Sequence, residues 1–106
     1  MANFRSKKHL LLCREQTCYL QFPCCTNHDT AAAHSNLQRH GRGFSFKSHD
    51  CFVVPACAPC HRELDHGKNL TKQEREDSFM RAWEAWQLTC WERGYFNVAK
   101  TEAIVA

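Results

Sequence analysis

The sequence has no apolar run that approaches the roughly 20 residues a membrane-spanning helix needs. Its first segment, residues 1–8, is basic, but the apolar stretch that follows, residues 9–13, is too short for the apolar region of a secretory signal. Internal repeats and low-complexity segments are also missing. These absences predict a protein with no membrane partner that stays in a reducing cytoplasm.

Cysteine, by contrast, is abundant, with eight in 106 residues. A chain of this length forms a single domain, residues 1–106, with a small core that a bound metal would help to stabilise. So many thiols indicate a disulfide framework or a metal site, and a reducing compartment favours zinc. The formal net charge of +3 is a mild bias toward polyanionic partners.

The central motif is Cys57-x-x-Cys60, which runs directly into His61. Two cysteines at this spacing place both sulfurs on one zinc ion, as in zinc ribbons and fingers. Asp65 follows His61 by four residues, so on a helix the two side chains project side by side toward a second cation or a phosphate. The stretch therefore predicts a thiolate site next to a site of harder ligands.

The other thiolates of the zinc site are expected upstream, at Cys18 and Cys25. Residues 19–22 between them have the composition of a strand, which Pro23 ends. Sulfurs on either side of this segment would converge on one zinc ion with the two sulfurs of the central motif. Spacing alone hardly separates Cys24 from Cys25 as the fourth ligand.

A basic segment lies between these two groups of cysteines. Residues 30–49 contain no acidic side chain, but they contain His34, Arg39, His40, Arg42, Lys47 and His49. Lys and Arg side chains neutralise phosphates without reading sequence, so Arg39, Arg42 and Lys47 are predicted to contact a phosphodiester backbone. The alternative is a solvated loop that happens to be basic.

Two strands and a helix are expected around this loop. Residues 31–36 read as a short strand, and residues 50–54, which are aromatic and β-branched, as a clearer strand closed by Pro55. A helix over residues 59–66 follows, with proline in its first turn and Gly67 as a left-handed terminator. The two strands, paired as an irregular hairpin, and the helix form a ββα unit with metal ligands at the join.

A longer helix is predicted over about residues 71–93. Thr71 and Glu74 form a capping box at its start, and Gly94 ends it. Four of its side chains recur at helical spacing and predict a core-facing stripe, with a base-stacking surface as the alternative: Phe79, Trp83, Trp86 and Cys90.

The ends of the chain carry less information. Residues 4–15 suit a short amphipathic helix, and residues 101–106 are expected to be disordered. Cys13, Cys51 and Cys90 are expected to be small buried hydrophobes.

These features carry a resemblance to a known family. A histidine on the first strand, a polar loop, a second strand and Cys57-x-x-Cys60-His61 opening a helix resemble the HNH, or ββα-metal, endonucleases. Over residues 18–67 the chain is similar to small nucleases encoded by phages and prophages, through Cys18, Cys25, residues 33–36, residues 40–43, Lys47, Asp50, Cys60, His61, Asp65 and Gly67. The resemblance implies an α+β fold: a zinc-stabilised ββα-metal core with an N-terminal helix and a long C-terminal helix. It also implies a bacterial host cytoplasm.

The resemblance implies roles for single residues as well. His34 matches the first histidine of the family, the general base that activates water. His61 matches the last histidine, a ligand of catalytic Mg²⁺ or another divalent cation, and Asp65 is a second ligand or orients an imidazole. Asn36 would complete the catalytic set by fixing the loop or polarising His34, or Asp50 would complete it by binding the cation.

The implied activity is hydrolysis of DNA phosphodiester bonds, with DNA as the partner. Structural zinc is then expected at Cys18, Cys25, Cys57 and Cys60. A homodimer fits this activity, because cutting both strands takes two active sites and the Trp-bearing helix offers an apolar face.

One position departs from the family pattern. Many HNH enzymes carry an acidic metal ligand immediately before the first histidine, and this chain has Ala33 there. The alternative function is therefore a non-catalytic zinc-ribbon module that binds DNA or takes part in assembly. A thiol redox role for Cys57 and Cys60 would require an alternating βαβ pattern, and the sequence does not show one.

Three residues of the expected site also have plainer interpretations. His61 fits a Cys₃His zinc site, because it directly follows Cys60. His34 fits a buried structural histidine, and Asp65 fits a cap or a partner of Arg62.

Overall fold

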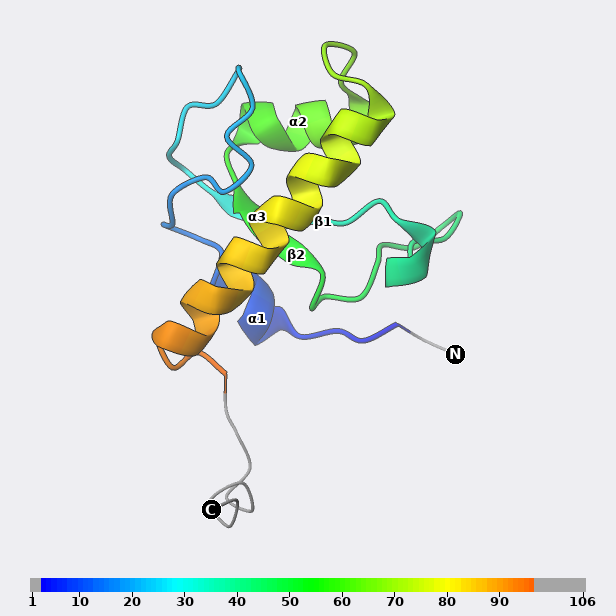
Figure 1. Cartoon of the computed structure of the whole chain (residues 1–106). Coiled ribbons are helices and arrows are strands. Elements are labelled where there is room, and N and C mark those ends of the chain that lie inside the picture. Colours follow the sequence, from blue (N-terminus) through cyan, green and yellow to red (C-terminus); the bar gives the residue numbers. More distant parts are fainter. Residues whose placement is uncertain (1–2, 97–106) are drawn as a thin grey trace.

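The computed structural model describes residues 3–96, which form a small α+β unit (Figure 1). Its elements in chain order are helix α1 (Lys7–Leu11), strand β1 (Ala31–His34), the 3-10 turn η1 (Gln38–His40), strand β2 (Val53–Ala56), helix α2 (Ala58–His66) and helix α3 (Lys72–Glu92). The predicted α+β class is confirmed. No helix among the described residues is long and apolar enough to cross a membrane. The expectation for residues 101–106 lies outside the described part of the chain.

Strands β1 and β2 pair as an antiparallel hairpin, as the sequence predicts, with His34 opposite Val53. Pro55 lies inside β2, opposite Ala32, although the sequence predicts that it ends the strand. Its carbonyl accepts a 2.9 Å hydrogen bond from the backbone N–H of Tyr19. Pro55 therefore faces the outer edge of the sheet, where its missing N–H breaks no bond between the strands.

The second strand begins later than residues 50–54 predict. Residues 50–52 form a turn instead, in which the N–H of Phe52 donates to the carbonyl of His49 at 2.9 Å. The Asp50 carboxylate is held by Arg5 and Ser6, which lie 45 and 44 residues away in the sequence. These contacts fix the turn, and no local pattern reveals them.

The strand predicted over residues 19–22 is wrong. Gln21 has a φ of 51°, in the left-handed region, so the backbone cannot continue as an extended strand there. Leu20 and Phe22 are nevertheless both buried in the core. The segment keeps its apolar side chains inside while making one backbone bond to the edge of β2, through Tyr19.

Helix α2 matches its predicted span, with proline in its first turn. Gly67 ends the helix with a φ of −68°, so the predicted left-handed terminator is wrong. A glycine is needed there for space, because a Cβ would lie 2.1 Å from the Glu63 carboxylate. That buried carboxylate accepts hydrogen bonds from Asn69 and from the backbone N–H of Leu70. It thereby fixes the linker between α2 and α3.

Helix α3 begins at the predicted capping box, where Thr71 and Glu74 each accept a bond from the backbone N–H of the other. It packs against β2 and crosses the hairpin (Figure 1). Phe79, Trp86 and Cys90 are buried, which confirms the core-facing stripe for these three. Trp83 is partly buried and donates to the carbonyl of Cys51 at 2.9 Å.

Helix α1 is shorter than residues 4–15 predict. Ser6 caps its start by accepting a bond from the N–H of His9 at 3.2 Å. Cys13, just beyond the helix, is buried as expected, whereas Cys51 is only partly buried.

The segment before α1 lies along the basic loop. Asn3 donates to the carbonyls of Gly41 and Lys47, at 2.7 and 2.9 Å, and Arg5 donates to the carbonyl of Lys47 at 2.8 Å. The backbone N–H of Phe4 donates to Nδ1 of His49 at 2.9 Å. The N-terminal segment therefore holds the basic loop at Gly41, Lys47 and His49.

Candidate functional site

Four cysteine sulfurs converge beside the ββα unit. The Sγ atoms of Cys18, Cys25, Cys57 and Cys60 all lie within 4.8 Å of one another. The sulfurs of Cys25 and Cys57 are 3.8 Å apart, close to the roughly 3.8 Å that four Zn–S bonds of about 2.3 Å impose in a tetrahedron. This group can hold a metal ion such as zinc. Cys24 is exposed and lies outside the group.

Local structure positions these sulfurs. Cys57 is the N-cap of α2 and Cys60 lies in its first turn. On the other side, the N–H of Cys18 donates to the side chain of Asn27 at 3.2 Å, and Asn27 adopts a φ of 62°. The N–H of Thr26 donates to the sulfur of Cys57 at 3.4 Å. The two loops thus bring their sulfurs together without the strand predicted between them.

The thiols differ in their readiness to ionise. Burial opposes ionisation of Cys57, but backbone donors from Cys60 and Thr26 outweigh it and lower its pKa to about 5. Burial and the neighbouring Cys18 raise the pKa of Cys25 to about 11. A cluster that favours one thiolate and opposes further negative charge is suited to binding a cation.

A histidine–carboxylate pair lies at the end of β1. The Nε2 atom of His34 is 2.8 Å from Oδ1 of Asp50, and the two side chains are 12% and 3% exposed. Asp50 also accepts bonds from Arg5, at 3.0 Å, and from the backbone N–H of Ser6, at 2.8 Å. The carboxylate is therefore bound on three sides and holds the imidazole in one orientation.

The ionisation of this pair follows from its surroundings. Burial lowers the pKa of His34, and the hydrogen bond that His34 donates to Asp50 only partly offsets this effect. Burial alone would raise the pKa of Asp50. The hydrogen bonds and positive charge supplied by His34, Ser6 and Arg5 have the larger effect and lower it. At neutral pH the pair is thus a carboxylate and a neutral imidazole. Because a carboxylate only accepts, Nε2 of His34 carries the proton and Nδ1 keeps a free lone pair.

A second histidine–carboxylate pair lies on α2. The Nε2 atom of His61 is 3.2 Å from Oδ2 of Asp65, one helical turn on. Asn36, just past β1, donates to Oδ1 of Asp65 at 3.0 Å and to the carbonyl of Leu64 at 3.3 Å. Although burial opposes it, the bonds from His61 and Asn36 lower the pKa of Asp65. Asp65 thus bonds to His61 and Asn36, and among residues 3–96 it forms no ion pair with Arg62.

The structure divides the expected catalytic residues into two groups. Asp50 is bound to His34, and it does not join His61 and Asp65 in a common ligand set. Among residues 3–96, the four cysteines are the only group of three or more His, Cys, Asp or Glu side chains whose ligand atoms gather together. His61 lies outside that group, so the thiols converge without it.

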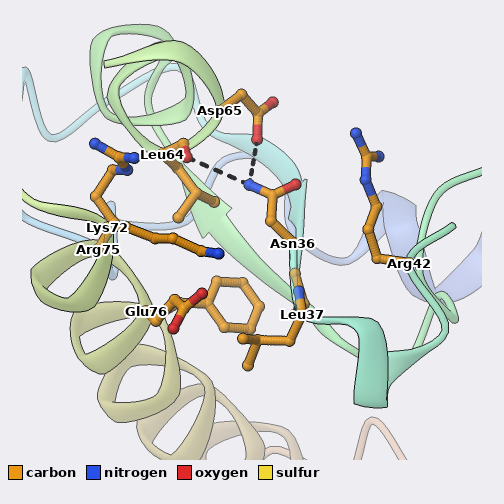
Figure 2. A pocket seen from close by; sticks show the side chains of 10 residues that line it. Asn36, Leu37, Arg42, Leu64, Asp65, Lys72, Arg75 and Glu76 are labelled. Atoms are coloured by element: carbon orange, nitrogen blue, oxygen red, sulfur yellow. Dashed lines mark hydrogen bonds between the residues drawn. The ribbon is translucent and has the colours of Figure 1, made fainter. Parts of the chain in front are cut away.

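A pocket of about 240 Å³ lies beside the second pair, between the end of β1, α2 and α3 (Figure 2). Figure 2 shows Asn36 and Asp65 meeting, with Lys72 extending from α3 toward one side of Asn36 and Arg42 lying on its other side. Arg75 also lines the pocket and donates to the carbonyls of Gly67 and Leu70, at 3.0 and 2.6 Å. The pocket combines two carboxylates, of Asp65 and Glu76, with an amide and three cations.

Sequence reasoning misses Lys72 and Arg75 as pocket residues. A signal was available, since both lie in the first turns of a helix whose start the capping box predicts. What the sequence could not supply is the position of that helix start against Asn36 and Asp65.

The predicted DNA-contacting residues Arg39, Arg42 and Lys47 are all exposed. Within the same loop, His40 is buried against Phe52, with ring centroids 4.0 Å apart, and shares a 2.6 Å hydrogen bond with Ser35. The loop thus has a packed inner side and a cationic outer side.

Comparison with known proteins adds one finding. The sequence model of the family described as "Protein of unknown function (DUF968)" matches residues 1–82. The chain belongs to this family. The match includes the four cysteines, both histidine–carboxylate pairs and the basic loop, and it ends within α3. Searches of curated proteins and of solved structures found no match to this DUF968 protein.

Proposed function

We propose that this protein is a metal-dependent endonuclease of the HNH type, which hydrolyses DNA phosphodiester bonds. The observation that carries the proposal is the His34–Asp50 pair, a neutral imidazole fixed by a buried carboxylate. Its position at the end of β1, on a ββα unit joined to a cluster of four thiols, supports the resemblance to this family.

His34 is the proposed general base. Hydrolysis needs a group that takes a proton from water near neutral pH, and a neutral imidazole does this. The bond from Nε2 to Asp50 leaves Nδ1 as the atom that receives the proton. Asp50 then stabilises the imidazolium that forms. In this proposal Asp50 is a positioning residue and not a metal ligand.

His61 and Asp65 are the proposed ligands of the catalytic cation. An imidazole and a carboxylate suit Mn²⁺, Ni²⁺ or Zn²⁺, and Mg²⁺ would use the carboxylate with phosphate oxygens and waters. A divalent cation bound there would neutralise charge on the phosphate and on the leaving oxygen. Asn36 holds Asp65 in place through its 3.0 Å bond. The four thiols are the proposed site of a separate, structural zinc ion.

The basic side chains are the proposed DNA contacts. Arg39, Arg42 and Lys47 project from the loop between the strands, and Lys72 reaches into the pocket beside Asn36. Phosphate contacts of this kind position the strand without selecting a sequence. A homodimer is part of the proposal, because Leu88 and Trp91 on α3 are 59% and 57% exposed and leave an apolar surface for a second copy. Sedimentation of the purified protein tests it.

One observation favours the non-catalytic alternative. Ala33, immediately before His34, is fully buried opposite Val54, so no carboxylate stands beside the histidine at that position. A module that keeps the thiol cluster and the basic loop would then bind DNA without cutting it.

A plasmid assay separates the two functions. Supercoiled plasmid is incubated with the purified protein alone and with added Mg²⁺, Mn²⁺ or Ni²⁺, while the zinc content is followed because chelators also remove structural zinc. Nicking that requires an added cation supports the nuclease. A sample that retains its zinc and retards DNA on a gel, yet never nicks it, supports the binding module.

A further inference from the structure

Two phenylalanines project from the tip of the basic loop. Phe44 is fully exposed (106%) and Phe46 is 60% exposed, in a chain whose other aromatic side chains mostly pack in the core. The N–H of Gly43 donates to the carbonyl of Phe46 at 3.2 Å, so the chain reverses tightly around Phe44 and Ser45. A single exposed apolar side chain is ordinary, so the notable feature is that two aromatic side chains are exposed together at one loop tip.

The reversal also depends on Gly43. A Cβ at this position would lie 2.2 Å from the Phe46 ring, so that ring rests directly on the glycine backbone. Phe46 therefore contacts the loop backbone at Gly43, while Phe44 is fully exposed.

The surroundings of the two rings are cationic. No acidic residue occurs between residues 30 and 49, and Arg39, Arg42 and Lys47 are exposed around the tip. Phe44 shares a groove of about 640 Å³ with three cations, Arg39, Arg42 and Lys72, and with one carboxylate, Glu76. Asn36 lines both this groove and the pocket of Figure 2, so the aromatic tip is continuous with the proposed catalytic region.

The base of the loop is fixed before any partner binds. Asn3 and Arg5 hold the carbonyls of Gly41 and Lys47, and the N–H of His49 donates to the carbonyl of His40 at 2.9 Å. A loop whose base is held in this way loses little conformational entropy when a ligand stacks on its tip.

We propose that Phe44 and Phe46 stack on unpaired bases of a DNA strand whose phosphates are held by Arg39, Arg42 and Lys47. Aromatic rings set in a positively charged groove are the arrangement that binds single strands, because every base has a face to stack on. A protein partner is less well matched, since the centres of protein interfaces are depleted of charged side chains. The inference rests on the proposed function and narrows its substrate to single-stranded or locally unpaired DNA.

Binding measurements test this without requiring cleavage. A labelled oligonucleotide, single-stranded or annealed to its complement, is titrated at moderate salt without added divalent cation. Phe44→Ala should weaken single-strand binding about tenfold to a hundredfold and leave duplex binding unchanged. Phe44→Trp should restore single-strand binding, whereas Phe44→Leu, which is apolar but has no aromatic face, should not. Leu11→Ala, which truncates a 48% exposed apolar side chain on α1, is the matched control and should bind like the wild type.

Several outcomes would overturn the inference. One is that Phe44→Ala loses affinity equally for the single-stranded and the duplex oligonucleotide, and another is that it loses affinity for neither. A third is that Phe44→Leu restores single-strand binding as fully as Phe44→Trp does. Sedimentation showing that Phe44→Ala dissociates a wild-type dimer, with single-strand binding intact, would assign the tip to a second copy of the chain. Because the Phe44 side chain is fully exposed, the variant should keep the wild-type melting temperature.

The two proposals fail separately. If the wild type cuts DNA but Phe44→Ala binds both probes as the wild type does, the base-stacking inference alone is wrong. If the wild type never cuts DNA but single-strand binding depends on Phe44, the nuclease proposal alone is wrong.

Discussion

The Nε2 atom of His34 lies 2.8 Å from Oδ1 of Asp50, and both side chains are nearly enclosed. Arg5 and the backbone N–H of Ser6 bind the same carboxylate, so the segment before α1 supports the end of β1. A histidine held in this way has one defined tautomer and one defined free nitrogen. Such an arrangement is suited to moving a proton.

Substitution of Asp50 tests the pair through a pH profile. A general base works when neutral, so the cleavage rate should fall as the pH drops through the lowered pKa of His34, below its usual 6.5. Asp50 raises that pKa, so in Asp50→Asn the fall in cleavage rate should occur at a still lower pH. The rate at neutral pH should fall about tenfold or more, because the imidazole loses its orientation.

The control for this variant is Asp29→Asn, which changes a carboxylate that is 95% exposed. If the cleavage rate of Asp50→Asn falls at the same pH as that of the wild type, the group whose protonation slows cleavage is not His34.

The same burial predicts how stability depends on pH. The folded-state pKa of His34 lies below its unfolded-state pKa. At pH values between these two pKa values, the unfolded chain therefore binds more protons than the folded chain. The contribution of His34 is fully present above pH 6.5 and is lost as the pH falls toward the lowered pKa. His34→Gln should therefore reduce the slope of unfolding free energy against pH, measured in urea between pH 7 and 5, by up to about 1.4 kcal/mol per pH unit. His28→Gln, whose side chain is 73% exposed, should leave the slope unchanged, and an equal slope in both variants would contradict the assignment.

The thiol cluster makes a quantitative prediction about metal. Denaturation should release about one zinc ion per chain. Cys57→Ser should remove most of the zinc and lower the melting temperature by about 10 °C or more. Cys24→Ser changes an exposed neighbour outside the cluster and should keep both values. Disulfides and no zinc in the native protein would contradict this account.

The basic loop should act through phosphates. Arg42→Ala and Lys47→Ala should each weaken duplex binding and reduce the slope of log affinity against log salt by about one. Arg14→Ala, an exposed arginine after α1, is the control. Unchanged slopes in both loop variants would mean that this loop does not face the DNA.

Features that depend on short-range chemistry could be predicted from the sequence. The capping box places the start of α3, and the spacing of Phe79, Trp86 and Cys90 gives its buried side. The convergence of the cysteines follows from a tight-turn motif joined to an upstream pair. The two helix signals lie within the helix that they determine, and the two cysteine pairs are recognisable locally although Cys25 and Cys57 are 32 residues apart.

Features that depend on distant partners could not be predicted. The orientation of Asp50 is set by Arg5 and Ser6, so its pairing with His34 cannot be predicted from the neighbouring sequence. Pro55 stays inside a strand because Tyr19 bonds the outer edge of the sheet. Gly67 is required by the Glu63 side chain, and no special backbone angle is involved.

The most direct test of the central claim compares two histidines. Plasmid cleavage with added Mn²⁺ is measured for the wild type, for His34→Ala and for His28→Ala, the exposed control, with zinc content and duplex affinity recorded for each. We expect His34→Ala to lose about 10²- to 10⁴-fold in rate while keeping its zinc and its affinity, and His28→Ala to match the wild type. Equal cleavage by His34→Ala and the wild type would contradict the account.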